Sequence, residues 1–130
     1  MDSKIFVTGI GFITSIGNDR ITVTDSLRKL VSGIEKHPEL QVESSPVKVA
    51  GTVKEFDLES TDPEDWTYPV AYQVPRTLIR SFSPHVLYAW SAVRQAITDA
   101  GLSQEDLSNP DSGLYTASGG SMRCIHKHFQ

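Results

Sequence analysis

The chain opens with an apolar run that passes directly into a glycine-punctuated turn. Residues 5–7 read Ile-Phe-Val, and Gly9, Gly11 and Gly17 follow. Glycine permits positive φ and close approach of backbone. A β-type run that breaks at glycines before a helical segment is therefore typical of the start of an α/β domain. Most interpretations of the function therefore depend on whether this turn binds a ligand or packs against the core.

The composition limits the class of protein. The length of 130 residues suits one domain, and 38% hydrophobic with 22% charged residues indicates a globular fold. A net charge of −4 provides no basic field for nucleic acid or an anionic membrane. The single cysteine, Cys124, excludes an internal disulfide framework, and there is no signal-like start or long apolar run. We therefore expect a cytoplasmic protein with neither nucleic acid nor membrane as a partner.

Three segments are predicted to be strands: residues 4–8, 47–53 and 113–118. Two helical segments separate them, so the order is strand, helix, strand, helix, strand. This order predicts an α/β fold with a mixed, mostly parallel sheet and packed helices. Residues 35–46 are expected to form a loop, and the acidic, proline-containing residues 55–75 an irregular excursion over the surface.

The first helical segment follows Asn18. Thr22 or Thr24 can cap its start, and Gly33 can end it as a C-cap. Its apolar positions recur at helical spacing: Leu27, Leu30, Val31 and Ile34.

The second helical segment carries the clearest signals in the chain. Ser83 and Pro84 suit the N-cap and the first helical position, and Gly101 suits the stop. A stripe of small residues would let this helix pack closely against another backbone: Ala89, Ala92, Ala96 and Ala100. Ser103 and Asp106 follow as a short capping turn.

The opening glycines are a poor dinucleotide-binding fingerprint. That motif needs Gly-x-Gly-x-x-Gly, and Thr14 stands where the third glycine belongs. The segment after residues 47–53 offers no clear acidic group for a ribose. Glycines that let the chain turn over a core are the favoured interpretation, and a nucleotide-binding module is the weaker one.

The remaining clusters of reactive or polar residues are also weak evidence for a functional site. Cys124, His126 and His128 are the densest group of metal-ligand residue types, and the cysteine could in principle be a nucleophile. Residues 118–121, Ser-Gly-Gly-Ser, could form an anion-binding turn or only a packing turn. The acidic side chains of residues 57–65 have no partner that spacing identifies, which favours a solvated loop. We assign no catalytic residue, no cofactor site and no metal site.

Five segments in order nevertheless resemble the β-ketoacyl-[acyl carrier protein] synthases of the thiolase-like superfamily. They are Ile5-Phe-Val-Thr-Gly-Ile-Gly-Phe-Ile-Thr-Ser-Ile-Gly17, Leu30-Val-Ser-Gly-Ile34, Val49-Ala-Gly-Thr-Val-Lys-Glu-Phe-Asp57, Ser91-Ala-Val-Arg-Gln-Ala-Ile-Thr-Asp-Ala-Gly-Leu102 and Gly113-Leu-Tyr-Thr-Ala-Ser-Gly-Gly-Ser121. The resemblance implies part of the N-terminal half of a thiolase-like fold. It also implies decarboxylative Claisen condensation of an acyl thioester with a malonyl thioester on acyl carrier protein, in fatty acid or polyketide synthesis.

The resemblance does not extend to the family's catalytic residues. The family's cysteine lies in a Thr-Ala-Cys type motif, and its histidines come later still. Cys124 lacks that context, and His126 and His128 do not match the family's histidine motifs. We therefore expect residues 1–130 to be one incomplete domain that ends before the nucleophile motif and is inactive alone. Its expected partners are acyl carrier protein and a second synthase chain, as a homodimer or a complementing polypeptide. A non-catalytic subunit of a heteromeric condensing enzyme is the alternative.

Such a piece of a larger fold is expected to expose apolar patches well beyond those of an ordinary monomer. It is therefore expected to be poorly soluble alone or to need a partner chain.

Overall fold

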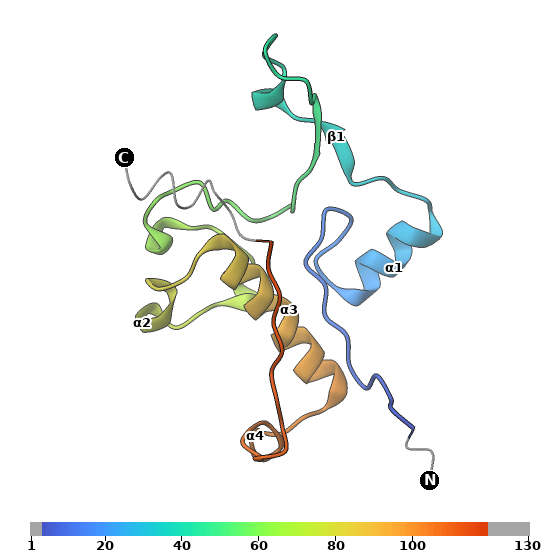
Figure 1. Ribbon diagram of the computed structural model, residues 1–130, viewed down its shortest axis with the longest axis vertical. Helices are drawn as coiled ribbons and strands as arrows, with labels where there is room; N and C mark the ends of the chain where they lie inside the picture. The colour runs from blue at the N-terminus through green and yellow to red at the C-terminus, as the bar shows by residue number, and fades with distance from the viewer. Residues whose placement is uncertain (1–3, 120–130) are drawn as a thin grey trace.

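The computed structural model describes residues 4–119, with the long helix α3 at its centre (Figure 1). The helices and strands are α1 (Arg20–Arg28), β1 (Ile34–Lys36), η1 (Pro38–Leu40), β2 (Val49–Gly51), η2 (Pro63–Asp65), η3 (Val70–Tyr72), α2 (Arg76–Ile79), α3 (Pro84–Ala100) and α4 (Gln104–Leu107), where η marks a 3-10 turn. α1 and the β1–β2 pair lie on one side of α3, and α2 lies on the other.

The predicted second helix is confirmed as α3. Pro84 occupies its first position, where the missing amide hydrogen costs nothing. Gly101 ends it in the left-handed conformation, with φ of 67°. The amide of Leu102 then donates to the carbonyl of Ile97 at 3.1 Å, which closes the last turn. The capping turn that follows is also confirmed, because Ser103 and Asp106 bond reciprocally at the start of α4.

The buried core lies where residues 56–82 cover the first half of α3. Val74, Ile79 and Leu87 are its buried members, and Leu87 has no exposed surface. Partly buried apolar side chains surround them: Phe56, Leu58, Trp66, Tyr68, Phe82 and Trp90. The predicted irregular excursion therefore supplies much of the core, with only short 3-10 turns for regular structure.

α1 differs from its prediction at both ends. Its N-cap is Asp19, which accepts from the amide of Thr22 at 2.8 Å, so neither predicted threonine is the cap. The helix ends at Arg28 and Leu30 adopts the left-handed conformation, with φ of 54°. Gly33 is therefore not the C-cap. The apolar positions assigned to this helix are exposed rather than buried: Leu27, Leu30, Val31 and Ile34.

The predicted parallel sheet is not confirmed in the described part of the chain. Its one sheet is the antiparallel pair β1–β2, in which Ile34 lies opposite Gly51. The predicted strand 47–53 therefore contains β2, whereas the predicted loop 35–46 begins inside β1. Residues 4–8 and 113–118 have no ladder partner within residues 4–119 and are not strands. A strand needs a neighbour for its backbone groups, and the described chain places none there.

Large apolar side chains are widely exposed within residues 4–119, as expected. Those at least 74% exposed are Ile5, Phe6, Val7, Ile21, Leu30, Val70, Leu114 and Tyr115. Within residues 4–119, no helix is long and apolar enough to cross a membrane.

Candidate functional site

The glycine turn is packed against the small-residue stripe of α3. A Cβ atom built on Gly9 would lie 2.2 Å from the carbonyl oxygen of Ala96, and one on Gly11 would lie 1.9 Å from that of Ala92. Real Cβ atoms do not approach backbone so closely, so glycine is required at both positions by packing. The predicted close approach is confirmed. Because α3 fills this side of the turn, the nucleotide-binding alternative is not favoured.

Side-chain amides fasten the same turn to its surroundings. Gln95 on α3 donates to the carbonyls of Asn18 at 2.8 Å and Phe12 at 3.1 Å, and it accepts from the Phe12 amide at 3.2 Å. The hydroxyl of Tyr72 donates to the Asn18 carbonyl at 2.7 Å. The Asn18 amide donates to the carbonyl of Lys54 at 2.8 Å. These bonds join the turn to three segments that are distant from it in sequence, so the turn has a structural role.

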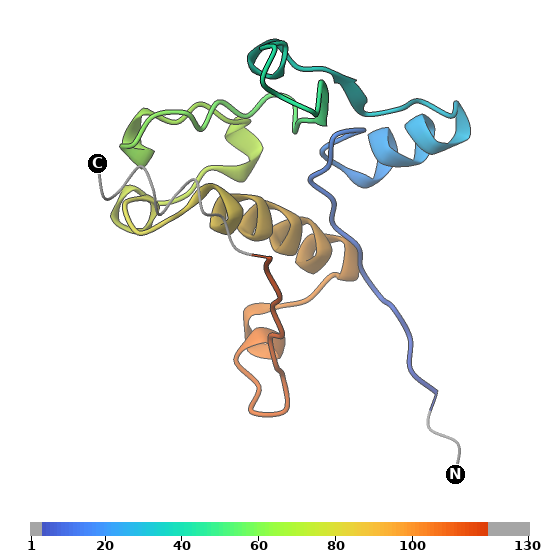
Figure 2. The same cartoon turned by 45° about the horizontal axis from the view of Figure 1, so that its top comes forward.

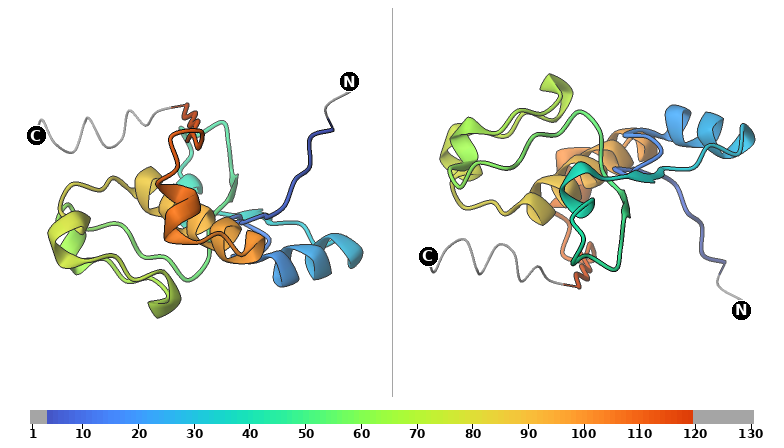
Figure 3. Two further views of the ribbon diagram at one scale, coloured as in Figure 1. Left: turned by 90° about the horizontal axis from the view of Figure 1, so that it is seen from below. Right: turned by 90° about the horizontal axis from the view of Figure 1, so that it is seen from above.

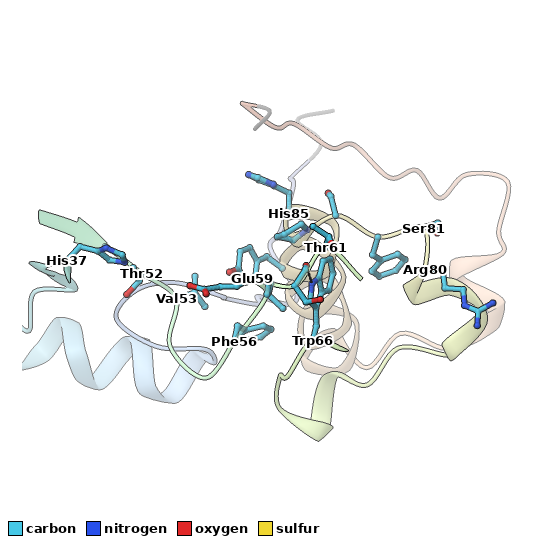
Figure 4. A pocket seen from close by; sticks show the side chains of 17 residues that line it. His37, Thr52, Val53, Phe56, Glu59, Thr61, Trp66, Arg80, Ser81 and His85 are labelled. Atoms are coloured by element: carbon cyan, nitrogen blue, oxygen red, sulfur yellow. Dashed lines mark hydrogen bonds between the residues drawn. The ribbon is translucent and has the colours of Figure 1, made fainter. Parts of the chain in front are cut away.

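A hollow lies between the end of β2 and the start of α3 (Figure 4). It measures about 920 Å³. Aromatic residues form its apolar wall: Phe56, Trp66, Phe82 and Tyr88. Its polar groups include His37, Thr52, Glu59, Thr61, Arg80, Ser81, Ser83 and His85.

The aromatic wall is continuous with the core. The Phe56 and Tyr88 rings meet edge to face with centroids 5.3 Å apart, and Phe82 meets Trp90 in the same way at 5.8 Å. The indole nitrogen of Trp66 donates to a loop carbonyl at 2.9 Å, so this side chain both anchors the loop and lines the hollow. Burial raises the pKa of the Tyr88 phenol. The wall is therefore suited to an apolar group.

The two histidines of the hollow lie apart. His37 lies beside Thr52 at one end, whereas His85 lies over the aromatic group on the first turn of α3 (Figure 4). Nδ1 of His37 is buried with no hydrogen-bond partner among the described residues. No hydrogen bond within residues 4–119 joins either histidine to a hydroxyl or carboxylate, which a nucleophile and its base require. Nor does this part of the chain hold a cluster of three metal-ligand residues.

Most of the candidate groups noted in the sequence lie outside the described residues. Cys124, His126 and His128 are among them, as is the second half of the Ser-Gly-Gly-Ser turn. Gly119 is described, and a Cβ built on it would meet nothing within 4 Å. The described residues therefore do not test the anion turn, the metal cluster or the cysteine nucleophile, and the expectation that none of them is a functional site stays a prediction.

The acidic loop contains an ion-pair cluster that the sequence did not reveal. Glu64 accepts from Arg76 at 2.7 Å and also pairs with Arg80, across 12 and 16 residues of sequence. The hydrogen bond from Arg80, followed by that from Arg76, lowers the pKa of the Glu64 carboxyl. The loop is therefore not simply solvated, because Glu64 ties η2 to α2.

Comparison with known proteins gives one consistent result. Residues 2–128 match the family described as "Beta-ketoacyl synthase, N-terminal domain". 3-Oxoacyl-[acyl-carrier-protein] synthase 1 of Haemophilus influenzae is 35% identical over 116 residues, which is 89% of this chain and 25% of that protein. The synthase 1 of Escherichia coli K12 is 38% identical over 118 residues, or 90% of this chain and 26% of the relative.

A second type of relative agrees with the first. 3-Oxoacyl-[acyl-carrier-protein] synthase 2 of Staphylococcus aureus N315 is 28% identical over 118 residues, covering 91% of this chain and 26% of the relative. The chain thus spans about a quarter of the length of the curated relatives that it matches. With the family match covering almost all of its length, the chain belongs to the β-ketoacyl synthase family and corresponds to its N-terminal domain.

Proposed function

We propose that this chain supplies the N-terminal portion of a 3-oxoacyl-[acyl carrier protein] synthase. The supporting observation is the match over residues 2–128, together with relatives whose names specify this activity. In the proposed reaction, an acyl group passes from a carrier thioester to an enzyme thiol. Malonyl-carrier loses CO₂, its α-carbon bonds to the acyl carbonyl carbon, and the enzyme thiol is released.

In this proposal, the described residues contribute structure rather than catalytic groups to the reaction. None of its described residues forms a nucleophile–base pair, so the acyl-accepting thiol and the oxyanion donors would come from outside residues 4–119. We therefore treat residues 1–130 as a single incomplete domain that is inactive alone. Its proposed partners are acyl carrier protein and a second synthase polypeptide, and the proposed location is the cytoplasm.

Decarboxylation of malonyl-acyl carrier protein tests the proposal. We expect the 130-residue chain alone to release no CO₂ above the protein-free rate. Combined with a polypeptide that carries the remaining three-quarters of the E. coli relative, it should form 3-oxoacyl-carrier, detectable by mass spectrometry. Turnover by the chain alone, abolished by Cys124→Ala, would contradict the proposed inactivity. Failure of both the mixture and a covalent fusion to condense would contradict the proposed function.

A non-catalytic subunit of a heteromeric condensing enzyme is less well supported. The relatives reported above carry the names of synthases rather than accessory subunits. That alternative would be favoured if this chain supported condensation only together with a second chain that already carries a complete active site.

A further inference from the structure

Residues 57–67 form a loop whose two ends are bonded to each other. The Asp57 amide donates to the Thr67 carbonyl at 2.8 Å, and the Thr67 amide donates to the Asp57 carbonyl at 3.0 Å. Within the loop, the indole nitrogen of Trp66 donates to the Ser60 carbonyl at 2.9 Å. A loop that is closed at its base and bonded internally can open and close as one unit.

This loop is one wall of the aromatic hollow. Leu58, Thr61 and Trp66 line the hollow from the loop, whereas residues 80–85 and Tyr88 line it from the other side (Figure 4). Leu58 and Trp66 also pack against the buried core, but both are only partly buried. Movement of the loop relative to residues 80–85 would therefore change how far solvent and small molecules reach the aromatic wall.

Glu64 attaches the far end of the loop to the opposite wall. η2, which carries Glu64, lies beside α2 at the end of the molecule opposite α1 (Figures 2 and 3). One oxygen of the Glu64 carboxylate accepts from Nε of Arg76 at 2.7 Å, and the other accepts from Nε of Arg80. The Glu64 side chain is 17% exposed, whereas the two arginine side chains are 81% and 70% exposed. Ion pairs with exposed partners add little stability and weaken in salt, so this attachment is readily released.

We infer that residues 57–67 are a flap over the aromatic hollow and that Glu64 is the latch that holds the flap closed. Arg80 lines the hollow and also bonds to Glu64, so the latch joins the two walls directly. An apolar molecule would reach the aromatic wall when the latch is released. The inference does not rest on the proposed function, because it concerns movement within residues 4–119.

Fluorescence quenching by acrylamide tests the inference, in a Trp90→Phe background that leaves Trp66 as the fluorophore. The variant is Glu64→Gln, and the matched control is Glu35→Gln, which breaks the exposed Lys54 pair outside the flap. Glu64→Gln should raise the Trp66 quenching constant about twofold, and Glu35→Gln should leave it unchanged. Salt at about 1 M should bring the background protein to the level of Glu64→Gln without changing that variant.

Hydrogen exchange separates opening of the flap from loss of the whole fold. In Glu64→Gln, the Thr67 amide and the Trp66 indole should exchange about fivefold faster, whereas the buried Leu87 amide should keep its rate. Arg76→Gln leaves Arg80 in place and should give an intermediate rate.

Three results would overturn the inference. They are unchanged quenching and exchange in Glu64→Gln, equal changes in Glu64→Gln and Glu35→Gln, and equal acceleration at the flap and at Leu87. None of these results bears on condensation by the complemented synthase, so the proposed function and the flap fail separately.

Discussion

Residues 9–12 and residues 4–8 are adjacent in sequence but have opposite environments. The glycine turn lies against α3 so closely that Gly11 has no room for a Cβ atom. The arm just before it, residues 4–8, contains three consecutive large apolar side chains, yet Phe6 is 74% exposed. The difference shows that apolar character alone does not bury a segment. The glycines of the turn are partly covered because α3 offers a stripe of small residues, whereas the described chain offers residues 4–8 no matching surface.

The largest expected effect comes from adding one methyl group to the turn. Gly11→Ala places a Cβ where the Ala92 carbonyl oxygen lies, so backbone must move. We expect a loss of about 3 kcal/mol in the free energy of unfolding. Urea unfolding followed by the fluorescence of Trp66 and Trp90 measures it. Gly119→Ala is the matched control and should change stability by less than about 0.5 kcal/mol, because no atom lies near its Cβ. Equal effects would mean that the turn is not tightly packed.

Removing the amide that fastens the turn should have the next largest effect. Gln95→Ala leaves the Phe12 amide and the Asn18 carbonyl without their partner. The expected loss is about 2 kcal/mol, from partly buried polar groups left unsatisfied. The same urea experiment applies. Gln104→Ala, on the exposed helix α4, is the control and should be nearly neutral. A neutral Gln95→Ala would show that the glycine contacts alone hold the turn.

Tyr72→Phe should have a smaller effect, about 1 kcal/mol near neutral pH, because it removes the hydrogen bond to the Asn18 carbonyl and the weaker one accepted from Gln95, whose amide keeps its other partners. Burial, followed by the charges of Asp19 and Glu55, raises the pKa of this phenol above the ordinary value of 10.0. Its contribution is therefore fully present below about pH 10 and is lost as pH rises through the raised pKa.

Stability measured from pH 7 to 11 checks the sign. The wild-type chain should lose stability above about pH 10 more steeply than Tyr72→Phe. Tyr115→Phe is the control, since Tyr115 is 97% exposed, and its profile should follow the wild type. Identical profiles for wild type and Tyr72→Phe would contradict the buried position of the hydroxyl.

The smallest effect is expected in the arm. Phe6→Ala should change the free energy of unfolding of the isolated chain by less than about 0.5 kcal/mol, because the ring contacts little. Phe56→Ala is the matched core substitution and should cost about 3 kcal/mol, since Phe56 packs against three aromatic rings. Destabilisation of similar size by both would show that the arm packs on the body.

Helix ends that depend on residues close together in the chain are predicted correctly from the sequence. Pro84 and Gly101 fixed the ends of α3, and Ser103 with Asp106 fixed the start of α4. The end of the first helix is predicted wrongly. Gly33 is the expected stop, but Leu30 adopts the left-handed conformation three residues earlier. In the candidate site, no local pattern indicated Gln95, whose partners lie 77 and 83 residues away.

The sequence by itself determined the membership in the β-ketoacyl synthase family, the position of α3 and the need for glycine where that helix approaches another backbone. Only the tertiary structure decided that β1 pairs with β2, that Glu64 joins two arginines and that residues 4–8 stay uncovered. The physical reason is the range of the interactions. Helix hydrogen bonds and caps close within about four residues, whereas strand pairing and buried polar contacts depend on surfaces that the rest of the fold must supply.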